Sequence, residues 1–395
     1  MLKAVVLAAG NGIRMQPLTS IRPKPLLKVL GETVIEHNLN QLKGLVKEVI
    51  IVVGYKGEMI KTLIGDKYQG MKISYVVQTE QLGTGDAARK ASVFLDDKFI
   101  LLNGDDLYFR QDIKRCLKKY PSILVGRVSD PSCFGVIEHN KEFVRNIMEK
   151  PERFPLNALV NTGLYYLDKS VFDSRIEKSP RGEYEFTDYV RGFILNERLR
   201  CVEAERWLPL SYPWNLLEAN ENLLEGIRRD IKGTVEKNCN IKGGVVVSQG
   251  AVIKSGTYIE GPVFIMKNSV VGPNSFIRGK TVIGVNSRIG NGVEVKNSVI
   301  GDNVRINHLS YVGDSVIDEG SNLGAGTIIA NQRFDSKNVR VPFKETKIDT
   351  NRSKFGAVIG ANANIGVNSS LMPGTIIDAE ATVMPLSLIK DRNEQ

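Results

Sequence analysis

The sequence predicts two folds in one chain: an α/β three-layer, mostly parallel sheet, followed by a left-handed parallel β-helix. Up to about residue 230, apolar runs alternate with amphipathic segments, which is typical of a parallel sheet covered by helices. After about residue 232, aliphatic residues recur every six positions, a period that neither a helix nor a meander keeps. A chain of 395 residues suggests about two domains. We therefore expect domains at 1–231 and 232–395.

The first domain is predicted from apolar runs that read as buried strands. These runs are 4–7, 48–53, 73–77, 99–102 and 123–128. Amphipathic helices are expected at 34–43 and 86–94, and a connector helix at about 214–231. Ligands of such sheets bind beyond the carboxyl ends of the strands, so the loop after 4–7 is the expected site.

The second domain is predicted from its six-residue period. A triangular coil explains the period, because each hexad forms one flat side and one corner with its aliphatic residue inward. The first register runs through Val235, Ile241, Val247, Ile253, Ile259, Ile265, Val271, Ile277, Ile283, Ile289 and Val295. It slips through Ile300, Ile306 and Val312, slips again through Ile317, Leu323 and Ile329, and resumes as Ile359, Ile365, Leu371, Ile377 and Val383. Three hexads per coil predict roughly seven coils, and the polar stretch 331–355 should loop out.

The loop after the first strand predicts a phosphate site. Gly10 and Gly12 leave bare amides that can close on phosphate oxygens, and Arg14 and Lys24 add positive charge. A P-loop is excluded because no Gly-Lys-Ser/Thr follows the glycines. A dinucleotide fingerprint is excluded because Met15 stands where its third glycine belongs.

The string G-x-G-x-R-M-x-P-L-T-x-x-x-P-K-P-L, which starts at Gly10, resembles the signature of sugar-1-phosphate nucleotidylyltransferases. The resemblance implies a Rossmann-like fold that joins a nucleoside triphosphate to a sugar 1-phosphate and releases pyrophosphate, with Arg14 and Lys24 as catalytic residues. It implies nucleotide contacts at Leu7, Ala9, Gly10, Gly12, Gln78 and Gly83. It implies sugar-phosphate contacts at Gly135, Glu149, Lys150, Asn161 and Glu185.

A metal site is expected at Asp105, in the string LLNGDD after the strand 99–102. A carboxylate at the end of a strand can hold Mg²⁺. The family usually has a second metal-binding aspartate in W-x-D-x-G, and here Pro209 occupies that position. Either Asp105 and the substrate phosphates hold Mg²⁺ alone, or Asp106 assists.

The strings NHLSYVGD and GAGTIIANQRFD resemble the acetyltransferase half of archaeal-type bifunctional enzymes that make UDP-N-acetylglucosamine. The chemistry needs a free amine, and His308 can take its proton because histidine titrates near pH 6.5. Tyr311 and Asn331 are expected to orient the amine or the oxyanion. The resemblance implies sugar-phosphate binding by Arg278, Lys296 and Lys337, acceptor positioning by Asn322, acetyl-CoA contacts at Ala325 and Ala361, and a homotrimer.

The composition favours small anionic substrates as partners. The net charge is +9, but the basic residues are spread along the chain without an aromatic-interleaved tract, so no nucleic-acid partner is expected. No apolar run reaches the roughly 18 residues of a membrane span, and no membrane partner is expected. Four scattered cysteines without a CxxC pair, and no signal-peptide pattern, predict a reduced, cytoplasmic protein.

The hypothesis is therefore a bifunctional cytoplasmic enzyme. It acetylates an amino-sugar 1-phosphate, with glucosamine 1-phosphate expected, using acetyl-CoA. It also joins a sugar 1-phosphate to a nucleotide from UTP or dTTP. Two alternatives stay open at this point: a nucleotidylyltransferase whose β-helix is structural or regulatory, and a non-catalytic assembly subunit.

Overall fold

The computed structural model describes residues 2–128, 130–155 and 157–393 and divides the chain into two compact units. The first unit comprises residues 1–11, 23–27 and 33–209. The second comprises 12–22, 28–32 and 210–395, so two short N-terminal segments group with the C-terminal half. The predicted sequence boundary at 231/232 stays a prediction.

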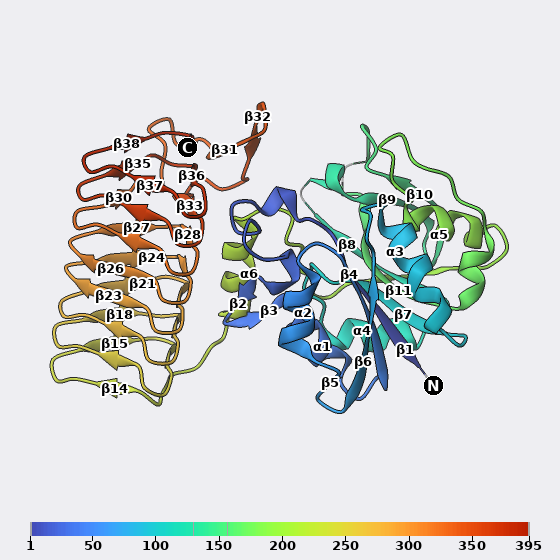
Figure 1. Ribbon diagram of the computed structural model, residues 1–395, viewed down its shortest axis with the longest axis horizontal. Helices are drawn as coiled ribbons and strands as arrows, with labels where there is room; N and C mark the ends of the chain where they lie inside the picture. Colours follow the sequence, from blue (N-terminus) through green and yellow to red (C-terminus); the bar gives the residue numbers. More distant parts are fainter. Residues whose placement is uncertain (1, 129, 156, 394–395) are drawn as a thin grey trace. The chain divides into compact units, whose positions relative to one another are not determined.

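The first unit is built on a ten-stranded sheet with the order β5-β6-β4-β1-β7-β11-β8-β12-β10-β9 (Figure 1). Its strands are β1 (Lys3–Ala8), β4 (Glu48–Val53), β5 (Lys67–Tyr68), β6 (Met71–Val77), β7 (Phe99–Asn103), β8 (Ser122–Arg127), β9 (Gly135–Asn140), β10 (Phe143–Glu149), β11 (Leu159–Leu167) and β12 (Arg200–Glu203). Strands β6, β4, β1 and β7 are parallel neighbours, whereas β11 runs antiparallel to β7, β8 and β9. Strands β2 (Lys28–Val29) and β3 (Glu32–Thr33) form a separate pair.

Helices cover both faces of this sheet, which confirms the three layers. The sheet is mixed rather than mostly parallel, because β5, β11 and the β9–β10 hairpin add antiparallel pairs to the parallel strands β6, β4, β1 and β7. The helices are α1 (Val34–Leu42), α2 (Gly57–Ile64), α3 (Thr84–Ala91), α4 (Arg110–Leu117) and α5 (Phe186–Ile194), with short 3-10 turns η1 (Ile13–Met15), η2 (Lys24–Leu26), η3 (Ser92–Phe94), η4 (Pro131–Cys133) and η5 (Lys169–Asp173). Alternate β1 side chains point to opposite faces. Val6 joins the core under α1, α2 and α4, and Val5 joins the core under α3 and α5. Thr33 and Glu36 form a capping box that starts α1.

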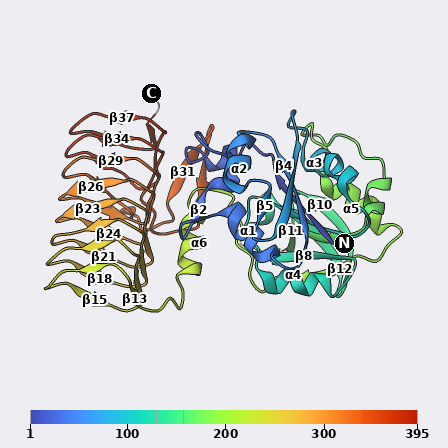
Figure 2. The same cartoon turned by 60° about the horizontal axis from the view of Figure 1, so that its bottom comes forward.

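The second unit contains helix α6 (Asn215–Leu223) and a parallel β-helix of three sheets whose strands stack coil upon coil (Figure 2). The helix is shorter than the connector predicted at about 214–231, because Gly226 takes φ of 74° soon after it and residues 230–231 already form the first strand of the β-helix. The first sheet consists of β13 (Asp230–Ile231), β16 (Val245–Val247), β19 (Val263–Ile265), β22 (Thr281–Ile283), β25 (Val299–Ile300), β28 (Val316–Ile317), β33 (Ala357–Ile359), β36 (Thr375–Ile377) and β39 (Arg392–Asn393). The second consists of β14 (Thr234–Val235), β17 (Val252–Ile253), β20 (Val270–Val271), β23 (Arg288–Asn291), β26 (Arg305–His308), β29 (Asn322–Leu323), β34 (Asn364–Ile365) and β37 (Thr382–Val383). The third consists of β15 (Asn240–Lys242), β18 (Tyr258–Glu260), β21 (Phe276–Arg278), β24 (Glu294–Lys296), β27 (Tyr311–Gly313), β30 (Ile328–Ile329), β35 (Ser370–Leu371) and β38 (Leu388–Ile389).

The predicted period of six corresponds to the core of the coils. The aliphatic residues of the three registers pack in one cluster, except that Val235 in the first coil is 36% exposed. The second and third sheets have eight strands each, one more than the seven coils predicted. The count was low because the 22 aliphatic positions behind it correspond to β14–β30 and β33–β37, whereas the described residues add β13 at the start and β38 and β39 at the end. Each slip of the register is a coil one residue shorter: Ile253 pairs with Val271, 18 residues on, but Ile289 pairs with Ile306, only 17 residues on.

The polar stretch 331–355 leaves the coils, as predicted. It carries an antiparallel hairpin of β31 (Arg340–Phe343) and β32 (Thr346–Asp349), which pairs with none of the three β-helix sheets. The coil resumes at β33, which pairs with β28 across the insertion. Among the described residues, no helix has the length and apolar character needed to cross a membrane.

Candidate active sites

A lysine and two aspartates meet at the end of β7 in the first unit. Lys24 is only 7% exposed, and its Nζ lies 2.8 Å from Asp105 Oδ2 and 3.8 Å from Asp106 Oδ1. Asp105 stays partly exposed while Asp106 is buried. Gly10 lies just beyond β1, the parallel neighbour of β7, and a Cβ built at Gly10 meets no atom within 4 Å. The cluster combines a fixed cation, open backbone and an accessible carboxylate.

Gln78 follows β6 and is held by hydrogen bonds rather than free. Its Nε2 donates to the carbonyl oxygen of Gly83 at 3.0 Å and to Asp86 Oδ2 at 2.8 Å. Gly83 has φ of 101°, and a Cβ there would lie 2.5 Å from the carbonyl oxygen of Tyr184. Glycine is therefore required at position 83. Because both amide hydrogens of Gln78 are used, its side chain presents an acceptor.

The predicted sugar residues gather around Glu149 at the end of β10. Gly135 pairs with Glu149 across β9 and β10, and Thr187 Oγ1 donates to Glu149 Oε2 at 3.2 Å. Lys150 Nζ lies 3.7 Å from Glu149 Oε1. Burial raises the pKa of Glu149, with Lys150 acting against the shift and Glu185 adding to it. Glu149 and Glu185 line one cleft of about 810 Å³.

Asn161 and Glu185 are both fixed by neighbouring side chains. Asn161 Nδ2 donates to Tyr165 Oη at 2.6 Å, and Asn161 Oδ1 accepts from Gly163 N at 2.8 Å. Glu185 precedes α5, and its Oε1 accepts from Arg181 at 2.7 Å. The side chains of Asn161 and Glu185 are thus each held in one orientation.

Gly12 and Arg14 belong to the second unit. Gly12 has φ of 63° and begins η1, and the Arg14 guanidinium lies 5.7 Å from the centre of the Tyr212 ring. The same segment ends at Arg22, which is 3.1 Å from Asp318 Oδ1. Burial raises the pKa of Asp318 to about 6, against the opposing effect of Arg22.

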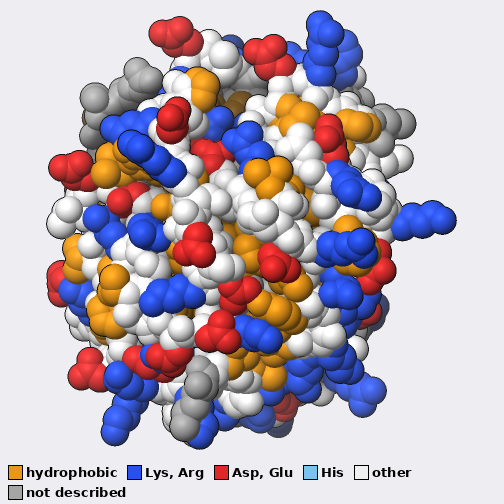
Figure 3. All heavy atoms as spheres, turned by 90° about the vertical axis from the view of Figure 1, so that its right-hand side faces the viewer, with side chains coloured by type: hydrophobic (Ala, Val, Ile, Leu, Met, Phe, Trp, Pro, Cys, Tyr) orange, Lys and Arg blue, Asp and Glu red, His pale blue; other side chains and the backbone are white. Residues whose placement is uncertain are grey.

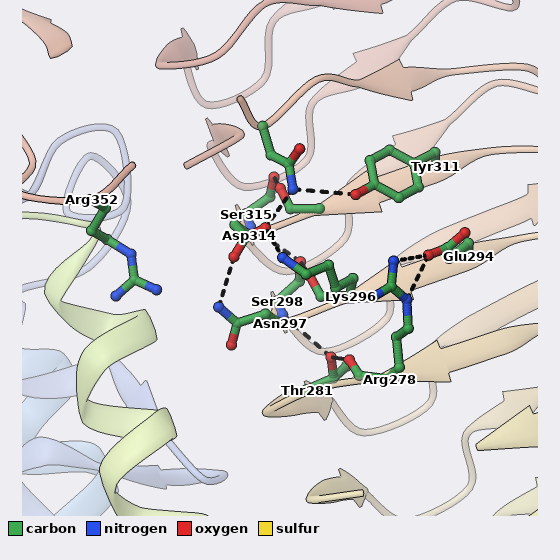
Figure 4. Close-up of polar contacts among 12 residues, drawn as sticks. Arg278, Thr281, Glu294, Lys296, Asn297, Ser298, Tyr311, Asp314, Ser315 and Arg352 are labelled. Carbon is green, nitrogen blue, oxygen red and sulfur yellow. Dashed lines mark hydrogen bonds and ion pairs between the residues drawn. The ribbon is translucent and has the colours of Figure 1, made fainter. Parts of the chain in front are cut away.

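Predicted residues of the β-helix lie one above another on the third sheet (Figure 4). Arg278 of β21 is in register with Lys296 of β24, and Glu294 is in register with Tyr311 of β27. The Arg278 guanidinium binds Glu294 Oε1 through Nε at 2.8 Å and Nη2 at 2.7 Å. The coil register itself therefore places cations from successive turns side by side.

Asp314, which follows β27, gathers three donors from this ladder. Lys296 Nζ donates at 2.7 Å, Asn297 Nδ2 at 2.8 Å and Asn331 Nδ2 at 2.5 Å. Asn331 Nδ2 also donates to Tyr311 Oη at 3.2 Å. Burial, reinforced by Asp314, raises the pKa of Tyr311, so its phenol keeps its proton at neutral pH.

His308 ends β26 at the corner that leads to β27, and its side chain is exposed rather than sealed inside the coils. Its backbone carbonyl accepts from Ser310 Oγ at 2.7 Å and from Gly326 N at 3.3 Å, so the next coil passes Ala325 and Gly326 beside it. The imidazole is accessible for the predicted role as a base.

The remaining predicted residues occupy separate places on the second unit. Asn322 lies on β29, in register with Asn364. Lys337 is exposed on the insertion, near Arg333 and Arg340 around a small cavity of about 460 Å³. Ala361 is fully buried, and its predicted contact with acetyl-CoA stays a prediction.

Comparison with known proteins identifies the family. The nucleotidyl transferase family matches residues 3–226, and the GMPPB C-terminal domain matches 259–352. The bifunctional protein GlmU of Methanocaldococcus jannaschii is 40% identical over 393 residues, 98% of this chain and 95% of the relative. A bifunctional protein GlmU of Methanococcus maripaludis is 43% identical over 402 residues, 100% of this chain and 96% of the relative.

The chain belongs to the GlmU family of bifunctional proteins. A relative from Sulfurisphaera tokodaii, a bifunctional sugar-1-phosphate nucleotidylyltransferase/acetyltransferase, is 39% identical over 398 residues, 98% of this chain and 97% of the relative. A solved structure from Bacillus anthracis, described as a glucose-1-phosphate thymidylyltransferase in complex with sucrose, is 26% identical. It covers 58% of this chain and 98% of its own, with a TM-score of 0.52.

Membership of the GlmU family confirms the resemblance found in the sequence, the order of the two folds and the interpretation as a bifunctional transferase. The individual site residues remain predictions.

Figure 3 shows one face of the first unit, on which basic and acidic side chains alternate without a continuous basic surface.

Sequence reasoning missed the residues that hold the sites together. Asp314 stood inside the quoted string NHLSYVGD, but nothing in a linear string says that its carboxylate turns toward Lys296 and Asn331. Asp86 and Tyr165, which fix Gln78 and Asn161, gave no signal in the sequence either. Such partners are identified only by their contacts.

Proposed function

We propose that this GlmU-family chain N-acetylates glucosamine 1-phosphate, or a related hexosamine 1-phosphate, with acetyl-CoA. It then joins the sugar 1-phosphate to the nucleotidyl group of UTP or dTTP and releases pyrophosphate. The product is UDP-N-acetylglucosamine or a close analogue. The observation that carries the proposal is the presence, in one chain, of a Lys24–Asp105 pair beyond β7 and a Lys296–Asp314–Asn331 cluster on the β-helix.

In the nucleotidyl step, a phosphate oxygen of the sugar 1-phosphate attacks the α-phosphorus of the nucleoside triphosphate. The bond between that phosphorus and the bridging oxygen breaks, and pyrophosphate leaves with the electron pair. Lys24 and Arg14 neutralise charge on the phosphates during this transfer. Glu149, Asn161 and Glu185 accept or donate hydrogen bonds at the sugar, and their fixed orientations limit how it binds.

Mg²⁺ fits the donor set around Asp105. Mg²⁺ sites commonly use one or two carboxylates, substrate phosphates and water. Asp105 is partly exposed and Asp106 lies beside it, both near Lys24. No group of three or more His, Cys, Asp or Glu residues suited to a metal occurs within residues 2–128, 130–155 and 157–393. Asp105 would therefore hold the ion together with the phosphates, and the bound ion would supply charge neutralisation.

The orientation of Gln78 supports a uracil or thymine base. Its two amide hydrogens point to Gly83 and Asp86, so Oε1 is left to accept. Uracil and thymine present an N3–H donor to such an acceptor, whereas cytosine presents N3 as an acceptor. The contact accepts both UTP and dTTP, because the two bases share this edge.

In the acetyl step, the amine nitrogen of the amino sugar attacks the thioester carbon of acetyl-CoA. The C–S bond breaks, the amine loses a proton to His308, and the thiolate of CoA takes a proton as it leaves. The exposed imidazole of His308 suits this exchange with solvent and substrate. Arg278, Lys296 and Lys337 bind the phosphate, Asn322 helps to position the acceptor, and Ala325 and Ala361 are the proposed acetyl-CoA contacts.

A homotrimer formed through the β-helix is part of the proposal. Large apolar side chains are exposed near the acetyl-transfer residues: Leu309 at 64% and Phe334 at 101%. Burial of these side chains against neighbouring subunits would remove apolar surface from water. We also propose a cytoplasmic location, supported by four cysteines that are all free thiols.

A panel assay tests the proposed function. The purified full chain would receive acetyl-CoA with glucosamine, galactosamine or mannosamine 1-phosphate, and CoA release would be measured. UTP, dTTP, CTP or GTP with Mg²⁺ would follow, and pyrophosphate release would be measured. Activity with an amino-sugar phosphate and with UTP or dTTP supports the proposal, and the absence of CoA release from every sugar would contradict the acetyltransferase half.

Two alternatives keep specific observations in their favour. The match of residues 259–352 to the GMPPB C-terminal domain, and Pro209 in place of the usual aspartate, fit a nucleotidylyltransferase with a structural β-helix or an assembly subunit. His308 distinguishes the first alternative, since a structural β-helix needs no base there. Pyrophosphate release distinguishes the second.

A further inference from the structure

Asp314 is a buried carboxylate at the centre of the predicted acetyl-transfer residues. It is 2% exposed, and φ of 48° turns the chain sharply after β27. Its own N–H donates to the carbonyl oxygen of Lys296 at 2.8 Å, and its carbonyl accepts from Gly356 N at 2.9 Å. The coil below and the chain that returns from the insertion therefore both fix its backbone.

The three donors around this carboxylate leave it no role as a proton donor. Lys296 and Asn331 both donate to Oδ2, and Asn297 donates to Oδ1. A carboxylate surrounded only by donors is stabilised as an acceptor. Asn297 is tied in turn to Glu221 of α6, with 2.9 Å between Nδ2 and Oε1, and Glu221 pairs with Arg352 of the insertion.

The hydrogen bonds of the Asn331 amide nitrogen determine which end of this amide faces a ligand. Its two Nδ2 hydrogens are directed to Asp314 Oδ2 and Tyr311 Oη. Within the described part of the chain, no donor meets Asn331 Oδ1. Asn331 thus presents an acceptor, which suits the N–H of an amine and not the developing oxyanion of a thioester.

The hydrogen bonds of Tyr311 and Lys296 likewise show which donors these two side chains have left for a ligand. Tyr311 Oη accepts from Asn331, so its own hydrogen is available to donate to an oxygen of the substrate. Lys296 gives one of its three hydrogens to Asp314 and keeps two for a phosphate. One carboxylate therefore sets the hydrogen-bond polarity of Asn331 and, through it, of Tyr311, and it holds the Lys296 ammonium group in place.

We propose that Asp314 is a positioning residue for acetyl transfer: it holds the Asn331 amide so that Oδ1 receives the acceptor amine, and it fixes Lys296 toward the sugar phosphate. The proposal rests on the acetyltransferase activity proposed above. It assigns amine orientation to Asn331 and oxygen donation to Tyr311, which sequence reasoning left open.

The test is Asp314→Asn in the full-length protein. The new amide brings hydrogens of its own toward Asn331 and Lys296, so Asn331 turns a donor toward the amine. We expect kcat for acetyl transfer from acetyl-CoA to glucosamine 1-phosphate to fall about tenfold to a hundredfold. The KM for acetyl-CoA and the rate of pyrophosphate release from UTP should stay within about twofold, since neither depends on this amide.

A matched control makes the same charge change elsewhere in the β-helix. Asp302 accepts hydrogen bonds from Lys28 and from Val285 N, outside the predicted site. Asp302→Asn should leave kcat for acetyl transfer unchanged.

A swapped pair separates positioning from mere support of the fold. Asp314→Asn combined with Asn331→Asp restores one carboxylate and one amide with an acceptor still facing the amine. It should recover at least about tenfold of the kcat lost in Asp314→Asn, and it serves as the test if the single variant fails to fold. No recovery, or a wild-type kcat in Asp314→Asn, overturns the proposal. A wild-type protein with no CoA release overturns the proposed function instead.

Discussion

The two polar clusters of this protein are assembled in different ways. In the first unit, Lys24 and Asp105 are 81 positions apart in sequence and meet because loops converge beyond the parallel strands of a mixed sheet. In the second unit, Arg278 and Lys296 stand in register on successive coils of one sheet, and Tyr311 stands on the next coil in register with Glu294. In a repeated fold, the number of residues per coil therefore decides which site residues align. In the sheet of the first unit, the order and direction of the strands decide it.

The difference also affects what holds each side chain. Residues of the first unit each depend on a nearby partner of their own, such as Asp86, eight positions on, for Gln78 and Tyr165, on the same strand β11, for Asn161. In the β-helix, Asp314 alone organises neighbours from the coils before and after it. We therefore expect single substitutions to act locally in the first cluster and more broadly in the second.

The largest expected effect separates the two clusters completely. His308→Ala removes the proposed base, so CoA release should fall by about a thousandfold while pyrophosphate release is unchanged. His139→Ala, at an exposed histidine of the first unit, is the matched control and should change neither rate. A parallel fall of both rates in His308→Ala would show that the clusters are not independent.

The reciprocal substitution is Lys24→Met. It removes the buried cation beside Asp105, and pyrophosphate release should fall by about a hundredfold with CoA release unchanged. Lys28→Met, which removes an exposed lysine paired with Asp302, is the control. Equal losses in the two variants would point to a general effect of charge.

A smaller effect should come from Glu149, whose pKa is raised mainly by burial. A carboxylate that must be ionised to accept from a sugar hydroxyl loses this role as the pH falls through its raised pKa. The KM for the sugar 1-phosphate in the nucleotidyl reaction should therefore begin to rise at a higher pH than an ordinary glutamate would allow. Glu149→Gln should raise that KM about tenfold and flatten the profile, whereas Glu203→Gln, at an exposed ion pair, should not.

The smallest effect concerns stability, at the Arg22–Asp318 pair of the second unit. The folded pKa of Asp318 is raised to about 6, above the roughly 3.9 of an unfolded aspartate. The folded state then binds the extra proton more tightly, so this residue's contribution to stability is greatest below about pH 4 and declines as the pH rises toward 6. Thermal melts should therefore show that the stability of the wild type relative to Asp318→Asn falls as the pH rises from about 4 to 6. A difference in stability that stays constant over this range would contradict the shift in pKa.

Sequence alone determined the two folds, because both leave periodic signals. Alternating apolar runs marked β1, β4 and β7, and the period of six marked the inward side chains of the coils, since each must avoid water at a fixed place in its repeat. The sequence also marked the outlying insertion at 331–355, where the apolar period stops.

Only the tertiary structure decided which side chains meet at the sites and which end of each amide faces a ligand. The carboxylate of Asp314 meets Lys296 and Asn331 only because a coil returns above its predecessor after 17 or 18 residues, and the insertion brings the chain back beside it. The polarity of the Gln78 and Asn331 amides is likewise set by partners from other segments. The direction of a hydrogen bond depends on which donors and acceptors are in contact, and the order of residue types along the chain does not determine those contacts.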